Sequence, residues 1–126
     1  MSADRARLRL LIIDDEVDVL DVLGSTAPAY AFDPIVVSSV AQAVRVVTEG
    51  HAIDVVVCDM SMPDGGAEAW LRAVATHRPE LAAKTIVITG WSGHGESPLA
   101  GVDPDRYLYK PFSMSDVRRL ADQLLG

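Results

Sequence analysis

Residues 55–66 read VVVCDMSMPDGG, in which four apolar residues lead into Asp59 and a loop of Met, Ser, Pro, Asp and Gly follows directly. A short apolar run bounded by turn residues is typical of a strand that is buried on both faces of a parallel sheet. An Asp at the end of a strand is most often a turn or capping residue. Asp59 is therefore either such a cap or a reactive group, and the rest of the chain decides between the two.

The bulk composition is that of one soluble domain. The chain has 126 residues, of which 49% are apolar and 23% charged, and this length suffices for a single core. It contains no apolar run of about 18 residues, so no membrane span is predicted. The N-terminus MSADRARLRL lacks the apolar core of a signal peptide, and we therefore expect a cytoplasmic protein.

The charged residues are unevenly distributed among types. Asp and Glu number 18 against 11 Lys and Arg, a net charge of −7, which argues against direct nucleic-acid binding. Lys84 and Lys110 are the only lysines, so each is a candidate for a specific role. Cys58 is the only cysteine and lies inside an apolar run, where we expect a buried small hydrophobe and no disulfide.

Short apolar runs alternate with helical patterns along the chain. The predicted strands span residues 8–13, 34–37, 54–58, 85–89 and 106–109. Apolar residues recur at helical spacing between them, with Ser38 or Ser39 as the cap of the second helix and Trp70 on the apolar face of the third. Residues 113–116 (SMSD) resemble a capping box that opens the last helix.

This alternation predicts a parallel sheet covered by helices on both faces. Right-handed crossovers then make a doubly wound α/β domain the natural solution. The fold uses the whole chain, so we expect one domain over residues 1–126 with no output domain attached.

Polar side chains stand where the predicted strands end: Asp14 and Asp15 after the first, Asp59 after the third, Thr89 after the fourth and Lys110 after the fifth. Ligands of doubly wound sheets bind outside the carboxyl ends of the strands. If the first and third strands are neighbours, three carboxylates converge there and repel one another unless a cation lies between them. An acidic all-oxygen site suits Mg²⁺, so the sequence predicts a magnesium site.

The same residues can perform phosphoryl transfer. A carboxylate such as that of Asp59 can attack phosphorus and form an aspartyl phosphate. The transition state then needs cations around the equatorial oxygens, which Mg²⁺ and Lys110 can supply, and the Thr89 hydroxyl can donate a further contact. Each residue alone fits a turn, a cap or β-propensity, but their joint placement at one sheet edge favours a reactive Asp59.

Four segments, LLIIDDE, VVVCDMSMP, TIVITG and YLYKPF, occur in order along the chain. With them, residues 8–125 resemble a receiver domain of a two-component response regulator. The resemblance implies a flavodoxin-like five-stranded sheet of order 2-1-3-4-5. It also implies a phosphorylation-controlled switch, not a turnover enzyme, that takes a phosphoryl group from a histidine kinase or phosphotransfer protein and acts on a downstream protein target. The sequence does not decide whether phosphorylation drives dimerisation.

The resemblance assigns a role to each residue on the metal side of the site. Asp14 and Asp15 match the acidic pair that holds Mg²⁺, and Asp59 matches the phosphoacceptor. Ser61 matches the position whose backbone carbonyl binds the metal.

On the other side of the site, the resemblance implies a switch. Thr89 matches the hydroxyl that turns towards the phosphoryl group, and Lys110 matches the lysine that contacts it. Tyr107 matches the aromatic residue that swings inward when the threonine moves, although a half-buried strand aromatic is the alternative. Pro111 resembles a residue usually preceded by a cis peptide bond.

The chain departs from the family pattern in two loops. Ala67 stands where a glycine is usual, and Gly65 and Gly66 come sooner, so we expect a shortened loop after Asp59. Residues 92–105 are poor in helix formers, which predicts a short fourth helix and a changed signalling surface. The Gly-Trp pair after Thr89 and the segment PELAAKTIVITG resemble receivers of hybrid histidine kinases more than those of transcription factors.

Two other functions fit parts of this pattern. A Mg²⁺-dependent aspartyl-phosphate phosphatase would need a second Asp two residues after the nucleophile, where Ser61 stands. A phosphorylation-independent interaction domain would not need every chemical position to be filled. A P-loop or dinucleotide site is excluded because no glycine motif follows the first strand.

Trp91 generates a first prediction. Gly90 is small and leaves a phosphodonor access to Asp59, whereas Trp91 can cover the acyl phosphate and hinder attack by water. We expect slow self-dephosphorylation and a faster loss of phosphate from Trp91→Ala, followed as phosphate release. A variant that hydrolysed no faster would favour the alternative, in which Trp91 packs on a neighbouring loop.

Overall fold

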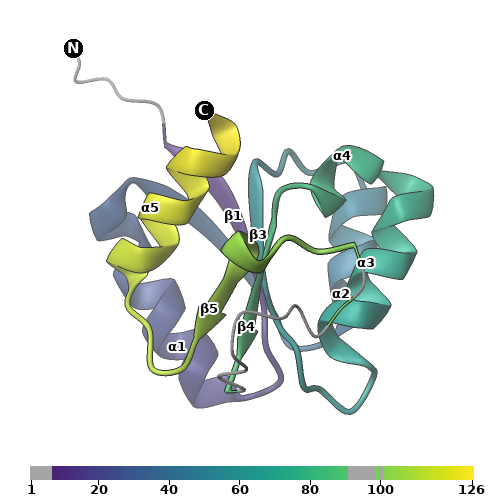
Figure 1. Cartoon of the computed structure of the whole chain (residues 1–126), viewed down its shortest axis with the longest axis horizontal. Coiled ribbons are helices and arrows are strands. Elements are labelled where there is room, and N and C mark those ends of the chain that lie inside the picture. Colours follow the sequence, from purple (N-terminus) through teal and green to yellow (C-terminus); the bar gives the residue numbers. More distant parts are fainter. Residues whose placement is uncertain (1–6, 91–98, 100) are drawn as a thin grey trace.

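The computed structural model describes residues 7–90, 99 and 101–126. Five parallel strands form one sheet in the order β2-β1-β3-β4-β5 (Figure 1). They are β1 (Leu8–Ile13), β2 (Phe32–Val37), β3 (Val55–Asp59), β4 (Thr85–Thr89) and β5 (Tyr107–Tyr109). The predicted doubly wound fold and its strand order are confirmed.

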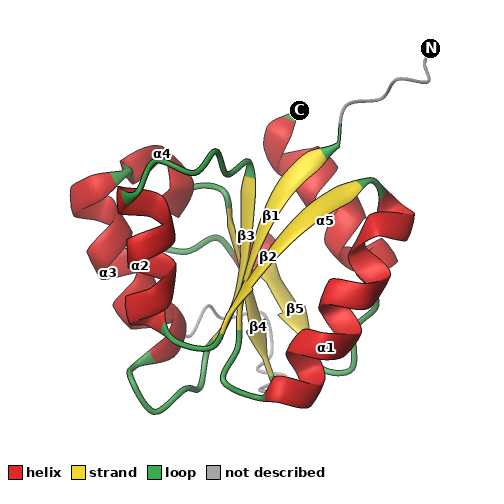
Figure 2. Cartoon of the chain, turned by 180° about the vertical axis from the view of Figure 1, so that it is seen from behind, coloured by secondary structure: helices red, strands yellow, loops and turns green. Residues whose placement is uncertain are grey.

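Helices cover both faces of the sheet. The two on one face are α1 (Val17–Thr26) and α5 (Met114–Leu125), and the two on the other are α2 (Val40–Thr48) and α3 (Gly66–His77) (Figure 1 and, from behind, Figure 2). The single turn α4 (Pro79–Ala82) follows α3, and short 3-10 helices lie at η1 (Ala27–Tyr30) and η2 (Pro104–Arg106). No helix in the described part of the chain is long and apolar enough to cross a membrane.

A few element boundaries differ from the predicted ones. β2 begins at Phe32, two residues before the prediction, because an edge strand tolerates the missing N–H of Pro34. β3 extends to Asp59, which pairs with Ile88 of β4. The single turn α4 before β4 was not predicted; it begins at Pro79, a position where proline suits the first turn of a helix. The short fourth helix predicted within residues 92–105, after β4, falls largely outside the described residues.

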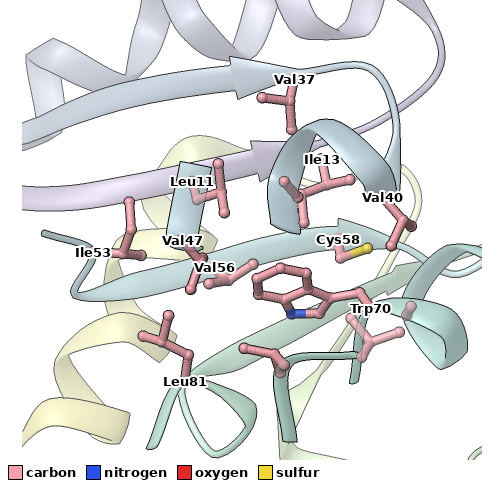
Figure 3. Packing of buried hydrophobic residues seen from close by; sticks show 14 of the residues in the cluster. Leu11, Ile13, Val37, Val40, Val47, Ile53, Val56, Cys58, Trp70 and Leu81 are labelled. Carbon is pink, nitrogen blue, oxygen red and sulfur yellow. The ribbon is translucent and has the colours of Figure 1, made fainter. Parts of the chain in front are cut away.

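The central strands are buried on both faces, as their apolar composition predicts. Alternate residues of β1 and β3 contribute to different cores: Leu11 and Val56 pack under α2 and α3, whereas Leu10 and Val57 pack under α1 and α5. Cys58 is fully buried in the first of these cores (Figure 3). Burial raises the pKa of its thiol above the ordinary value, in keeping with a packing role.

Trp70 lies in the same core and is fully buried (Figure 3). Its indole N–H donates a hydrogen bond to the Thr85 hydroxyl at 3.0 Å, and that hydroxyl donates in turn to the Leu81 carbonyl at 2.8 Å. Thr85, at the start of β4, therefore provides the hydrogen-bond partner both for a buried donor of α3 and for a carbonyl of α4.

Both predicted caps are present. The Ser39 hydroxyl accepts a hydrogen bond from the Gln42 N–H at the start of α2. Ser113 and Asp116 form the capping box of α5. At the other end of α5, the Lys84 ammonium donates to the Leu124 carbonyl at 2.7 Å, where a cation also suits the helix dipole. One of the two lysines therefore has a structural role.

The Trp70–Thr85 contact gives a stability prediction. Thr85→Val keeps the shape of the side chain but leaves the indole N–H without its acceptor, so we expect a loss of about 1–3 kcal/mol in the free energy of unfolding. Thr85→Ser keeps the hydroxyl and is the control, expected to unfold at higher urea concentration than Thr85→Val. Equal stability of Thr85→Val and the unmodified protein in urea would contradict this prediction.

Candidate functional site

Three carboxylates meet at the carboxyl ends of β1 and β3. These strands are neighbours in the sheet, with Ile13 opposite Cys58, so the residues that follow each of them are also brought together. One oxygen from each of Asp14, Asp15 and Asp59 lies within 4.8 Å of the others. Asp14 and Asp59 are buried, each only 4% exposed, and Asp15 is exposed.

Backbone groups hold the two buried carboxylates. The Glu16 N–H donates to Asp14 Oδ1 at 2.9 Å, and the Ser61 N–H donates to Asp59 Oδ1 at 3.2 Å. Burial nevertheless raises the pKa of the Asp14 carboxyl, and the nearby Asp59 carboxylate adds to the rise, against the opposing hydrogen bond from Glu16. A divalent cation would remove this repulsion, and an all-oxygen donor set of this kind fits Mg²⁺.

A cation that directly follows β5 completes the group. The Lys110 ammonium lies 3.4 Å from Asp59 Oδ2, and the Lys110 N–H donates to the Thr89 carbonyl at 2.9 Å. The peptide bond between Lys110 and Pro111 is cis, as the family resemblance implies. The structure therefore brings an ammonium group to the carboxylate that the sequence singled out.

Thr89 and Tyr107 are both buried, each 5% exposed. Thr89 ends β4 next to β3, where its neighbour Ile88 pairs with Asp59. The Tyr107 hydroxyl accepts a hydrogen bond from the Leu99 N–H at 3.1 Å. Tyr107 is thus buried with its hydroxyl engaged, not half-buried as in the simpler interpretation.

The early glycines of the loop after Asp59 are explained by the start of α3. Gly65 and Gly66 both have positive φ, at 104° and 56°. A Cβ on Gly66 would lie 2.3 Å from the Met60 carbonyl oxygen and 2.8 Å from that of Asp59. The helix thus begins in contact with the backbone of the phosphoacceptor candidate, and only glycine permits this approach.

Asp64 is a site residue whose partner the sequence did not indicate. Its Oδ2 accepts a hydrogen bond of 2.7 Å from the Val40 N–H, the first residue of α2, and its Oδ1 accepts one of 3.4 Å from the Gly66 N–H. The contact with Val40 spans 24 residues, and no local pattern could have revealed it.

A groove borders the site between α1 and the segment after β5. Its volume is about 410 Å³. It is lined by Glu16, Asp18, Val19, Val22, Leu23, Lys110, Pro111 and Phe112. Among the described residues, a Cβ placed on Gly90 would meet no atom within 4 Å. Trp91 lies outside the described residues.

Comparisons with known proteins identify the family that this chain resembles. A family model for the response regulator receiver domain matches residues 10–122. A response regulator receiver domain protein from Clostridium thermocellum is similar at 27% identity and a TM-score of 0.79, with 94% of each chain covered. A response regulator receiver protein from Sinorhizobium medicae shares 27% identity at a TM-score of 0.72, again with 94% of each chain covered.

One further solved structure is informative for its contents. The response regulator TrrA from Thermotoga maritima, in complex with Mg²⁺-BeF, has the same fold at 21% identity and a TM-score of 0.75, covering 94% of this chain and 99% of its own. The search among curated protein sequences gave no match. The family model matches most of the length of the chain, and an acidic cluster lies at the strand ends. The chain therefore belongs to the response regulator receiver domain family.

Proposed function

We propose that this chain is a phosphorylation-controlled signalling switch whose phosphoacceptor is Asp59. The observation that carries the proposal is the placement of the Asp59 carboxylate. It is buried, it adjoins the carboxylates of Asp14 and Asp15, and it lies 3.4 Å from the Lys110 ammonium. A strand cap would need none of these neighbours, whereas phosphoryl transfer needs all of them.

The metal-binding residues in this proposal are Asp14, Asp15 and Asp59, together with the backbone carbonyl of Ser61. Mg²⁺ held there would neutralise the acidic cluster and stabilise the charge on a transferring phosphoryl group. The Mg²⁺-BeF complex of the Thermotoga response regulator supports this choice of metal.

The phosphoryl donor in this proposal is a phosphohistidine on a histidine kinase or phosphotransfer protein. An oxygen of Asp59 attacks the phosphorus, the P–N bond breaks, and its electron pair stays on the departing imidazole. The Lys110 ammonium, already paired with Asp59, stabilises the equatorial oxygens of the group in transit. The groove between α1 and Phe112 reaches Lys110 and offers the donor protein a surface beside the site.

The switch in this proposal consists of Thr89 and Tyr107. An acyl phosphate on Asp59 adds negative charge and acceptor oxygens at the end of β3, and the Thr89 hydroxyl at the end of β4 then turns towards them. Tyr107 in its inward position then fills the space that Thr89 leaves. This favours one state of an existing two-state equilibrium. The downstream partner is a protein that recognises the shifted state.

Two alternatives are less well supported. A Mg²⁺-dependent aspartyl-phosphate phosphatase needs a general acid two residues after its nucleophile, and Ser61 occupies that position. A phosphorylation-independent interaction domain gives no reason to bury two adjacent carboxylates beside a lysine, because burial of like charges is unfavourable. The receiver modifies itself and need not turn over a substrate.

Incubation with acetyl phosphate tests the proposal. We expect Mg²⁺-dependent, base-labile incorporation of one phosphoryl group, and its complete loss in Asp59→Asn, because the amide is a poor nucleophile. Asp54→Asn is the matched control: Asp54 precedes the same strand, and its carboxylate accepts a hydrogen bond from the Arg9 N–H at 2.8 Å, which the amide oxygen can still accept. Label that survives Asp59→Asn, or that does not need Mg²⁺, would refute the proposal.

A further inference from the structure

The loop that follows Asp59 is joined to the sheet at its beginning. The Met60 N–H donates to the Ile88 carbonyl at 2.8 Å, and the Met62 side chain is buried in the core. The Gly65 N–H donates back to the Met62 carbonyl at 3.0 Å, which closes a turn. Ser61 lies between these anchors, and its side chain is exposed.

The far end of the loop is joined to a different element by Asp64. The 2.7 Å hydrogen bond from the Val40 N–H to Asp64 Oδ2 connects the loop to the first residue of α2. The 3.4 Å bond from Gly66 to the other oxygen connects the same carboxylate to the start of α3. One side chain therefore bridges two helix N-termini, where backbone N–H groups lack intrahelical partners and a negative charge is favourable.

This bridge leads back to the other half of the acidic cluster. The helix α2 follows β2 after two residues, and the carbonyl of Val37, the last residue of β2, accepts a hydrogen bond of 3.2 Å from the Asp14 N–H. Asp64 thus connects the segment that carries Ser61 to the segment that holds Asp14. The helix α2 also has its own cap, Ser39, so Asp64 is not its sole capping group.

We infer that Asp64 is a positioning residue for metal binding, because its carboxylate holds the Ser61 segment against the N-terminus of α2 and so fixes that segment relative to Asp14 and Asp59. The inference rests on the proposed function, in which the Ser61 carbonyl and the two carboxylates bind Mg²⁺. Asp64 is not a metal ligand in this account. It acts through the hydrogen bonds to Val40 and Gly66.

Three variants separate this role from helix capping. Asp64→Ala removes both hydrogen bonds. Asp64→Asn keeps an acceptor oxygen for the Val40 N–H, and Asn and Asp cap helices about equally well. Ser39→Ala removes the other cap of the same helix without touching the loop. The Mg²⁺ dissociation constant is measured from the amide chemical shifts of the ¹⁵N-labelled protein titrated with MgCl₂. The hydrogen-exchange protection of the Val40 amide and the stability in urea are the other two readouts.

We expect Asp64→Ala to weaken Mg²⁺ binding about tenfold, the low end of what loss of supporting contacts costs a metal site. The Val40 amide should lose protection in the same variant. Asp64→Asn and Ser39→Ala should bind Mg²⁺ within about twofold of the unmodified protein, because both leave the loop attached to α2. Ser39→Ala should nevertheless lower the urea midpoint. Together with its unchanged Mg²⁺ affinity, this would show that a weaker helix cap does not by itself weaken Mg²⁺ binding.

Two outcomes would overturn the inference about Asp64 and leave the proposed function intact. Equal Mg²⁺ affinities of Asp64→Ala and Ser39→Ala would show that the loop needs no support from Asp64. An Asp64→Asn variant as weak as Asp64→Ala would show that the hydrogen bond from Val40, which the amide oxygen still accepts, does not position the loop. Failure of the unmodified protein to bind Mg²⁺ would instead overturn the proposed function, and the inference with it.

Discussion

The main physical constraint in this structure is the repulsion between two buried carboxylates at adjacent strand ends. Asp14 and Asp59 are each only 4% exposed and lie in one cluster. At an effective dielectric constant of about 20, two like charges some 4 Å apart repel by about 4 kcal/mol. Lys110 offsets part of this at Asp59, and a divalent cation would offset more. The proposed function uses this repulsion, since a bound Mg²⁺ would relieve it and would in turn attract the oxygens of a phosphoryl group.

The scaffold gives the acidic edge its rigidity. The central strands are buried on both faces, so the residues that end them have little freedom, and the cores under α2–α3 and α1–α5 fix the sheet from both sides. The two lysines act at opposite ends of this arrangement. Lys84 precedes β4 and anchors the end of α5, whereas Lys110 follows β5 and reaches Asp59. The loop after Asp59 depends on Gly66 for its close packing and on Asp64 for its attachment to α2.

Much of this could be predicted from the sequence, because the relevant signals are local. Residues 8–13 and 85–89 are strands with the predicted bounds, since each is a short, mainly apolar run. The strand order then brings the polar residues at their ends together. What the sequence could not supply involves contacts between distant residues. The hydrogen bond between Val40 and Asp64 is of this kind, as is the Thr85 hydroxyl that receives the Trp70 indole. The roles of the site residues stay predictions.

The most direct test of the account is a crystal structure of the protein grown with Mg²⁺ and beryllofluoride, a mimic of the phosphoryl group. The account predicts beryllofluoride on Asp59, Mg²⁺ bound by Asp14, Asp15, Asp59 and the Ser61 carbonyl, and contacts from Lys110 and Thr89 to the fluorines. A structure with no beryllofluoride on Asp59 at saturating concentrations, or with Mg²⁺ bound elsewhere, would contradict it.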